Sequence, residues 1–269
     1  MSLLVIVPSN RVYTLGPKYS FSDILTRKLY PEAEIKYSDK PSKLVEKASK
    51  GYITIVPVEN SIAGLVGEII RKIREVDNVF INKEIYYPIN LCLGSLDNSE
   101  EDIEIIYSHP KAIEQCSNYF SKRKIKIKEA ESTSEAAKKI KNSNKKETGV
   151  ICAKEAIQEY GLNLLKENIQ DDKNNYTVFW ELSNKEKEID YNEKIGTALI
   201  VDLEDKPGAL FRFLNPFYKH EINLYFITSW PENGEYWFLI KMESDKIPKI
   251  KRVCKKYRCL GSYNIIDRR

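Results

Sequence analysis

Strand-like apolar segments alternate with helix-opening residues over the first part of this 269-residue chain. Short runs rich in β-branched residues predict strands at Arg11–Leu15, Ile53–Val58, Ile103–Tyr107, Ile125–Glu129 and Thr148–Ala153. Helices are expected to be opened by Ser22, to lie near Ser61–Val76, and to start from Pro110 and from about Ser134. A chain that alternates in this way folds into an α/β domain in which most strands are parallel.

A charged segment, Ser183–Asn192, interrupts this alternation and is the candidate linker. Beyond it, a strand, helix, strand, strand, helix and strand are expected, as in a ferredoxin-like βαββαβ module. These elements are Gly196–Leu203, a helix after the turn Lys206-Pro207-Gly208, Ile222–Ser229, a turn at Pro231–Gly234, Tyr236–Met242, a basic helix over Asp245–Tyr257, and Leu260–Ile266. Pro216 should kink or shorten the first helix, because proline lacks the backbone N–H.

Charge and cysteine content narrow the class of protein. The 43 basic and 39 acidic residues give a net charge of +4, which is too balanced to indicate nucleic acid as a partner. The five cysteines are scattered and form no CxxC pair, so an intracellular, cytoplasmic protein without a zinc site or disulfide framework is expected. No apolar run reaches the length of a membrane span, and the apolar start Leu3–Val7 is too short for a signal peptide.

Four polar stretches fall where predicted strands give way to helices: Ser20–Ser22, Val58–Gly64, Ser108–Pro110 and Ser132–Ala137. Each can be interpreted as helix capping, since serine and threonine satisfy free backbone N–H groups. Each can also be a ligand site, because helix N-termini attract anions and open α/β sheets bind ligands at the carboxyl ends of their strands. Glu59-Asn60-Ser61 favours the second interpretation, and a small dicarboxylate would suit such a cleft.

Several other side chains have competing interpretations. Cys116 is expected to pack in the core, where free cysteine is usually found. Gln115, one turn into its helix, can face either the cleft or solvent. His109 precedes Pro110 and is expected to start a helix rather than to act as a catalyst. Thr177, within the strand-like stretch NNYTVFW, is either a strand residue or a hydroxyl positioned for chemistry.

Taken together and in order, these motifs resemble those of the prephenate dehydratase family over nearly the whole chain. The catalytic domain of that family has counterparts of LGPKYSFS, VPVENSIAGLVGEI, YSHPKAIEQC, ESTSEAA, AIQEYGL and NNYTVF. The segments LEDKPGAL and INLYFITSWP resemble the two signatures of its regulatory ACT module. The resemblance implies a catalytic domain over 1–183, with lobes at roughly 1–76 plus 170–183 and at 77–169, then a linker over 184–194 and an ACT domain over 195–269.

The resemblance also implies a fold and an activity. The catalytic domain would be bilobal, like type II periplasmic binding proteins, and the ACT domain ferredoxin-like. The family converts prephenate to phenylpyruvate with loss of carbon dioxide and water, in phenylalanine biosynthesis, and uses neither a metal nor an organic cofactor. Its ACT modules pair in a homodimer or homotetramer, and phenylalanine binds at their interface as an inhibitor. Nucleic acid and membrane are not expected as partners.

Site residues are carried over from the family motifs. Thr177 would donate or relay a proton to the leaving hydroxyl, and Glu59, Asn60, Ser61 and Gln115 would orient it and the substrate. Chemistry of this kind needs a positioned donor and fixed dipoles rather than a strong base. The substrate-binding residues would be Ser20, Phe21, Ser22, Ser132, Thr133 and Phe179. The effector-binding residues would be Gly208, Ala209, Leu210, Asn223, Leu224 and Ser229.

Three positions depart from the family pattern. Val178 replaces an arginine, so either another basic residue reaches the substrate or substrate binding differs. Tyr19 replaces the usual glycine, so the turn is expected to differ, because tyrosine resists positive φ. Thr228-Ser229-Trp230-Pro231 replaces Glu-Ser-Arg-Pro, which leaves inhibition by phenylalanine open.

Two alternatives to prephenate dehydratase remain. Arogenate dehydratase performs the same chemistry on the amino analogue of prephenate. A non-catalytic sensor of small molecules would keep both ligand-binding folds, and Val178 would then mark an inactivated site.

Overall fold

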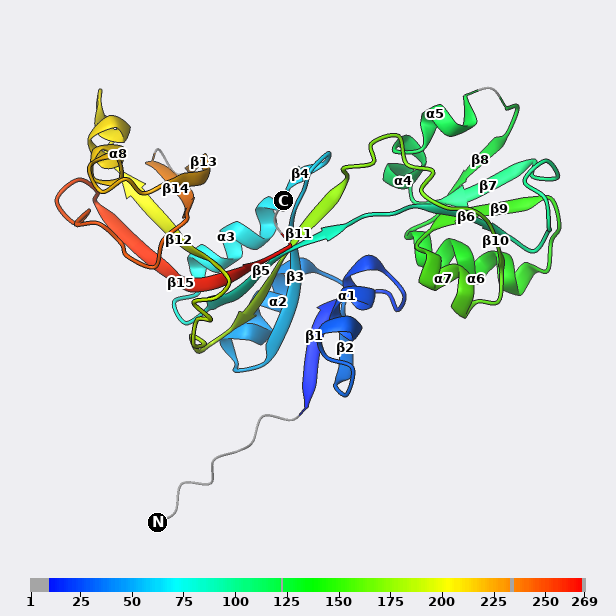
Figure 1. Cartoon of the computed structure of the whole chain (residues 1–269), viewed down its shortest axis with the longest axis horizontal. Coiled ribbons are helices and arrows are strands. Elements are labelled where there is room, and N and C mark those ends of the chain that lie inside the picture. Colours follow the sequence, from blue (N-terminus) through cyan, green and yellow to red (C-terminus); the bar gives the residue numbers. More distant parts are fainter. Residues whose placement is uncertain (1–9, 122, 233–234, 268–269) are drawn as a thin grey trace, which may run out of the picture. The chain divides into compact units, whose positions relative to one another are not determined.

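The computed structural model of the chain (Figure 1) describes residues 10–121, 123–232 and 235–267. The apolar start Leu3–Val7 and the end of the predicted turn at Pro231–Gly234 lie outside these residues. The chain forms two compact units and passes between them after Leu44, Thr54, Val66, Tyr86 and Val178. The first unit holds the chain up to Leu44 with Ile55–Val66 and Tyr87–Val178, and the second holds the remaining segments.

The first unit begins with the parallel pair β1 (Arg11–Leu15) and β2 (Glu34–Ser38), joined by α1 (Phe21–Leu29). Strand β1 has the predicted bounds, but α1 is opened by Ser20 rather than by Ser22. The Ser20 side chain accepts a hydrogen bond from the backbone N–H of Asp23 at 3.3 Å, as an N-cap does. The prediction of Ser22 as the opening residue was therefore wrong, and Ser22 is buried within the first turn.

Strand β3 (Ile53–Asn60) runs into a short hairpin with β4 (Gly64–Leu65). The Asn60 side-chain oxygen accepts the backbone N–H groups of Ile62 and Ala63 at 3.1 and 2.9 Å, so the chain turns here. The helix predicted near Ser61–Val76 consequently begins later, as α3 (Gly67–Glu75) in the second unit. Its predicted start was wrong because an asparagine turn competes with helix formation.

A five-stranded sheet forms the rest of the first unit, in the order β10-β6-β9-β7-β8. Its strands are β6 (Cys92–Ser95), β7 (Ile105–Ser108), β8 (Lys126–Glu129), β9 (Thr148–Cys152) and β10 (Asn163–Lys166). β7 is parallel to β8 and to β9, whereas β6 is antiparallel to its two neighbours. Three of the predicted strands are thus present, with bounds shifted by a residue or two.

Helices cover both faces of this sheet (Figure 1). They are α4 (Pro110–Glu114), α5 (Ser117–Phe120), α6 (Thr133–Ser143) and α7 (Lys154–Glu159). Successive strand residues enter opposite cores: Ile151 packs in the cluster that contains Cys116 and Phe120, and Val150 packs in the cluster that contains Ala137 and Ile157. The prediction that Cys116 is a core residue is confirmed.

The second unit contains a sheet in the order β13-β14-β12-β15-β5-β11. Its strands are β5 (Phe80–Pro88), β11 (Tyr176–Ser183), β12 (Lys194–Leu203), β13 (Leu224–Glu232), β14 (Glu235–Met242) and β15 (Lys256–Ile266). Helix α8 (Ala209–Lys219) packs on one face through Phe213 and Phe217. Helix α2 (Pro41–Ser49) begins in the first unit and ends in the second.

One predicted helix in this region is absent. No helix forms over Asp245–Tyr257, all of whose residues are described, and Lys256 already belongs to β15. Pro248 lacks a backbone N–H and disfavours helical backbone at Ile247, which breaks the pattern. Ile247, Ile250 and Val253 still pack on the core beside α8. Pro216 does not shorten α8, which continues to Lys219 with the buried Phe213 and Phe217 on either side of the proline.

None of the helices in the described part of the chain has the length and apolar composition of a membrane span.

Candidate active site

The side chain of Thr177 belongs to a hydrogen-bonded cluster of amides in the first unit. Asn60, at the end of β3, donates through Nδ2 to Thr177 Oγ1 at 3.1 Å and to Asn175 Oδ1 at 2.9 Å. Asn175 in turn donates through Nδ2 to Gln115 Oε1 at 3.1 Å. Because Thr177 accepts from Asn60, its hydroxyl proton is directed elsewhere and can be donated to a bound ligand.

Ser61 fixes the segment that precedes β11. Its hydroxyl accepts the backbone N–H of Tyr176 at 3.1 Å, and its own N–H donates to the Tyr176 carbonyl at 3.0 Å. The same hydroxyl donates to Asn175 Oδ1 at 3.3 Å. Ser61 therefore positions the backbone on either side of Thr177 and Asn175.

Glu59 belongs to the same strand as Asn60. It pairs with Leu65 across the β3–β4 hairpin, directly before Asn60 in the strand. Successive side chains of a strand point to opposite faces, so Glu59 faces away from the side on which Asn60 meets Thr177. Of the predicted catalytic residues, the structure brings together Asn60, Ser61, Gln115 and Thr177.

Asn175 is the member of the cluster that the sequence prediction omitted. It is 2% exposed, and its side chain contacts Asn60, Ser61 and Gln115. Its backbone carbonyl also accepts the N–H of Ile89 at 2.9 Å. The Asn-x-Thr pattern of NNYTVFW contains this residue, but an asparagine directly before a strand also has the composition of a turn.

Two helix N-termini meet close to one another in the same unit. Ser20 caps α1, and Ser132 caps α6 by accepting the backbone N–H of Glu135 at 3.0 Å. Ser134 donates to the backbone carbonyl of Lys18 at 2.5 Å, which joins the first turn of α6 to the loop before α1. Both helices therefore direct the positive ends of their dipoles toward this junction, as an anion-binding site requires.

Three further predicted substrate-binding residues, Phe21, Ser22 and Thr133, lie in the first turns of these helices. Phe21 and Thr133 are the first residues of α1 and α6, and Phe21 packs against the core cluster that contains Leu91. Ser22 is buried, and its carbonyl accepts the Thr26 hydroxyl at 2.7 Å.

Tyr19 adopts a left-handed backbone with φ of 62°. The expectation that this turn must differ from one built on glycine was wrong, because Tyr19 takes the positive φ that glycine would supply. Its N–H donates to Asp23 Oδ2 at 2.7 Å, and its hydroxyl donates to Glu159. Its ring packs edge-on against Tyr160, with ring centroids 5.5 Å apart. These contacts offset the steric cost of the conformation.

The residues that follow Thr177 in β11 are core residues. Val178 and Phe179 are both 1% exposed, so the position of the expected arginine is filled by a buried apolar side chain. A cation, Lys18, lies in the loop before α1, whose backbone contacts the first turn of α6. Lys18 is exposed, and its ammonium lies 4.5 Å from the centroid of the Tyr19 ring. The contact with Tyr19 raises the pKa of Lys18.

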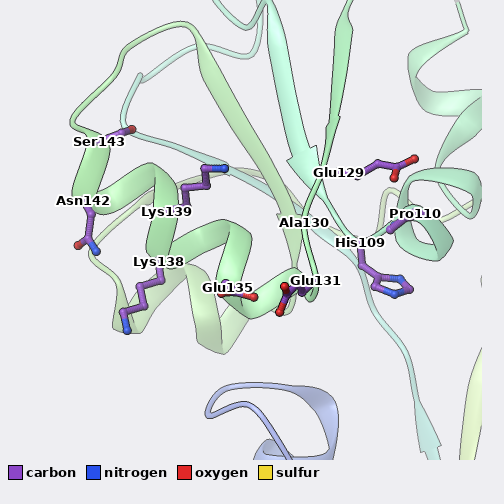
Figure 2. Close-up of a pocket in the computed structure, with 10 residues that line it drawn as sticks. All are labelled: His109, Pro110, Glu129, Ala130, Glu131, Glu135, Lys138, Lys139, Asn142 and Ser143. Atoms are coloured by element: carbon purple, nitrogen blue, oxygen red, sulfur yellow. The ribbon is translucent and has the colours of Figure 1, made fainter. Parts of the chain in front are cut away.

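A groove of about 1050 Å³ is lined by Ala130, Glu131 and Glu135, which flank Ser132 in the sequence (Figure 2). His109 and Pro110 lie on one side of it, and Lys138, Lys139 and Asn142 of α6 lie on the other. His109 is the N-cap of α4, with Nδ1 accepting the Lys111 N–H at 3.2 Å, which confirms its predicted role at a helix start. Burial lowers the pKa of His109, which keeps the imidazole neutral for that hydrogen bond.

The predicted effector residues lie at both ends of α8. Gly208, with φ of 78°, precedes the helix, and Ala209 and Leu210 form its first turn. Asn223 and Leu224 follow the other end, and Asn223 donates to Glu243 at 2.9 Å. An 11-residue helix is about 16 Å long, so one small ligand cannot contact both groups within a single chain. Ser229 is exposed in β13, opposite Phe238 of β14.

Comparisons with known proteins were made on both sequence and structure. The profile of the prephenate dehydratase family matches residues 12–187. The prephenate dehydratase of Methanocaldococcus jannaschii is 32% identical over 271 residues, which cover 95% of this chain and 98% of that protein. The arogenate dehydratase/prephenate dehydratase 1 of Arabidopsis thaliana is 35% identical over 195 residues, which cover 70% of this chain and 47% of that protein.

Among solved structures, the prephenate dehydratase of Arthrobacter aurescens in complex with L-Phe matches with a TM-score of 0.85. The two proteins are 26% identical, and the match covers 94% of this chain and 89% of the Arthrobacter chain. The prephenate dehydratase of Staphylococcus aureus matches with a TM-score of 0.81 at 28% identity, covering 94% of this chain and 100% of that chain. These matches confirm the expected fold class.

Proposed function

The chain belongs to the prephenate dehydratase family, and from this premise we infer that it converts prephenate to phenylpyruvate with release of carbon dioxide and water. The reaction breaks the bond from the ring to the carboxylate and the bond from the ring to the hydroxyl. The electron pair left by carbon dioxide completes the aromatic ring as the hydroxyl departs. The hydroxyl must take up one proton to leave as water, so the site needs a proton donor at that oxygen.

The observation that carries this assignment is the 3.1 Å hydrogen bond from Asn60 Nδ2 to Thr177 Oγ1. It fixes the position of the hydroxyl and leaves its proton for the departing oxygen. Asn175 and Gln115 hold Asn60 in place through the chain of amide contacts, so the donor is oriented before substrate binds. Thr177 is thus the proton donor or relay, and the amides are the groups that position it.

The carboxylates of prephenate would bind where the N-termini of α1 and α6 meet. Ser20 and Ser132 cap these helices, and Lys18, two residues before Ser20, would supply a positive charge to the substrate. Lys18 thereby takes over the electrostatic part of the role of the arginine that Val178 replaces. It acts as a point charge, whereas an arginine would offer a bidentate fork.

Regulation by phenylalanine would require a second copy of the chain. The effector residues Gly208–Leu210 and Asn223–Leu224 lie too far apart in one chain, so each ligand would contact one group from each copy. The edge strand β13 and α8 present exposed apolar side chains for such pairing, including Phe211 (76% exposed) and Tyr218 (82%). We therefore propose a homodimer with an ACT domain over 195–269 and a catalytic domain over 1–183.

Arogenate is the second candidate substrate, because the Arabidopsis relative carries both activities in its name. All five cysteines are free, which suits the reducing cytoplasm that we propose as its location.

The test is to incubate purified protein with prephenate, and in parallel with arogenate, and to follow phenylpyruvate or phenylalanine. Formation of phenylpyruvate above the spontaneous rate is expected. Turnover of arogenate together with a prephenate rate equal to the buffer blank would reassign the substrate to arogenate. No turnover of either compound would refute the proposed activity.

A further inference from the structure

The side chain of Tyr19 joins two parts of the first unit that belong to different sheets. Strands β1 and β2, with α1 between them, are part of the larger sheet, whereas α6 and α7 pack on the five-stranded sheet. The Tyr19 hydroxyl donates to Glu159, the last residue of α7, and its ring packs edge-on against Tyr160. Tyr19 and Glu159 also line the same cavity, of about 440 Å³, together with residues of α1 and α7. The loop before α1 is thus fixed to α7.

The backbone of Tyr19 is held in the left-handed region, with φ of 62°. A residue other than glycine keeps such a conformation only where its surroundings impose it, and these positions are often functional. Here the N–H of Tyr19 donates to the buried Asp23, and its ring packs on the core cluster that contains Ala156 and Ile157. Glycine could form this turn with less strain, but it has no side chain with which to reach Glu159.

The hydroxyl of Tyr19 is suited to the role of a donor. Burial and the contact with Glu159 raise the pKa of Tyr19, so the hydroxyl keeps its proton. A hydrogen bond to a carboxylate is stronger than one between neutral groups.

This contact lies next to the two helix N-termini at which we expect the carboxylates of the substrate. Tyr19 directly precedes Ser20, the N-cap of α1. On its other side, the carbonyl of Lys18 accepts the hydroxyl of Ser134, in the first turn of α6. Helices α6 and α7 pack beside one another in one core cluster. A bond from Tyr19 to α7 therefore also fixes the start of α1 relative to the start of α6.

We propose that Tyr19 and Glu159 form a positioning pair, which holds the N-termini of α1 and α6 at the spacing that the two carboxylates of prephenate require. This inference rests on the proposed function. The pair acts on binding and not on bond breaking, so it should govern KM rather than kcat. A second connection, between Lys28 of α1 and Glu155 of α7 at 3.4 Å, joins two exposed side chains and contributes little.

Variants of the full-length chain separate the hydrogen bond from the packing of the ring. Tyr19→Phe keeps the ring and removes the donor, and Glu159→Met removes the acceptor. Each should raise KM for prephenate about three- to tenfold and leave kcat nearly unchanged. The double variant should have no larger effect than either single one, because the same bond is lost in all three. Glu159→Gln keeps an acceptor oxygen and should retain a KM near that of the wild-type protein.

Tyr191→Phe is the matched control, because it removes a hydrogen bond from an exposed tyrosine to Asp245 in the second unit. It should leave KM unchanged. Amide hydrogen exchange measured by mass spectrometry without substrate is the second readout. The two single variants of the pair should speed exchange over both 16–24 and 154–161, whereas the control should change neither segment.

Two kinetic outcomes would overturn the proposal. One is an unchanged KM in both single variants, and the other is a double variant in which the two effects add, which would show independent roles. Absence of turnover by the wild-type protein would instead refute the proposed function. The exchange measurement separates the two failures: unchanged exchange over both segments overturns the pair whether or not the wild-type protein is active, and faster exchange over both supports it.

Discussion

Glu84 and Lys241 form an ion pair in the interior of the second unit, with 2.8 Å between Oε2 and Nζ and exposed side-chain fractions of 0% and 2%. Trp180 of β11 donates through Nε1 to the same oxygen at 2.8 Å, and Tyr225 of β13 donates to the other oxygen at 3.0 Å. Side chains of strands β5, β11, β13 and β14 thus converge on one buried carboxylate. Breaking such a pair leaves an uncompensated charge in the core.

Lys241→Met is therefore expected to lower the free energy of unfolding by about 3–5 kcal/mol. Urea unfolding followed by circular dichroism measures the change. The double variant Lys241→Met/Glu84→Gln should recover part of the loss, since no buried charge is then left alone. Lys43→Met, which breaks the exposed pair with Asp39, is the matched control and should leave the midpoint unchanged. Equal effects of the Lys43 and Lys241 changes would contradict the prediction.

Thr177→Ala is expected to lower kcat at least about a hundredfold, because it removes the hydroxyl that we propose as the proton donor. Thr177→Ser keeps a hydroxyl and should retain most of the activity. Steady-state kinetics with prephenate measure both. A near-normal kcat in correctly folded Thr177→Ala protein would refute the role.

Asn175→Ala is expected to give a contrasting outcome, because we propose that Asn175 positions other groups of the site and does not contact the substrate. It removes partners from Asn60 and Gln115, so stability should fall by about 1–3 kcal/mol together with kcat. Thr177→Ala, in which a half-buried hydroxyl is lost, should change kcat far more than stability. Identical stability and kinetic profiles for the two variants would argue against this division of roles.

Lys18→Gln is expected to raise KM for prephenate about tenfold and to leave kcat nearly unchanged, since it removes a charge that attracts carboxylates. The effect should shrink as salt is added. Lys40→Gln, which changes an exposed lysine just after β2, is the control. An unchanged KM would show that the carboxylates are bound without Lys18.

His109 makes stability depend on pH. Burial lowers its pKa below the ordinary value of 6.5, so its contribution to folding is present above pH 6.5 and is lost as the pH falls through the lowered pKa. Protonation of Nδ1 also removes the acceptor for the Lys111 N–H. Below pH 6.5, the urea midpoint of the wild-type protein should decrease more steeply with falling pH than that of His109→Asn. The asparagine keeps a helix cap but does not titrate. Parallel profiles would contradict this assignment.

Local patterns predicted the strands that carry the site, because strand composition and terminal polar residues are properties of short segments. The polar strand end Glu59-Asn60-Ser61 was recognised in this way, whereas the role of Thr177 was implied only by the resemblance to the family. Tyr19 could not be predicted, since its backbone depends on Glu159 and Tyr160, which are distant in sequence. Asn175 was missed because an asparagine before a strand has the composition of a turn. Pro248 is the signal in the sequence against the basic helix over Asp245–Tyr257, because proline disfavours helical backbone at the residue before it.

The repeated passage of the chain between its two units limits how the protein can be divided. A shortened chain that ends at 183 would retain α3 and β5 but would lack β15, the parallel partner of β5, and Arg258, which binds the end of α3. It would also leave Glu84 buried without Lys241. Proteolytic removal of the C-terminal strands should therefore not release an intact catalytic fragment. Loss of those strands would also destabilise β11, which contains Thr177 near its start.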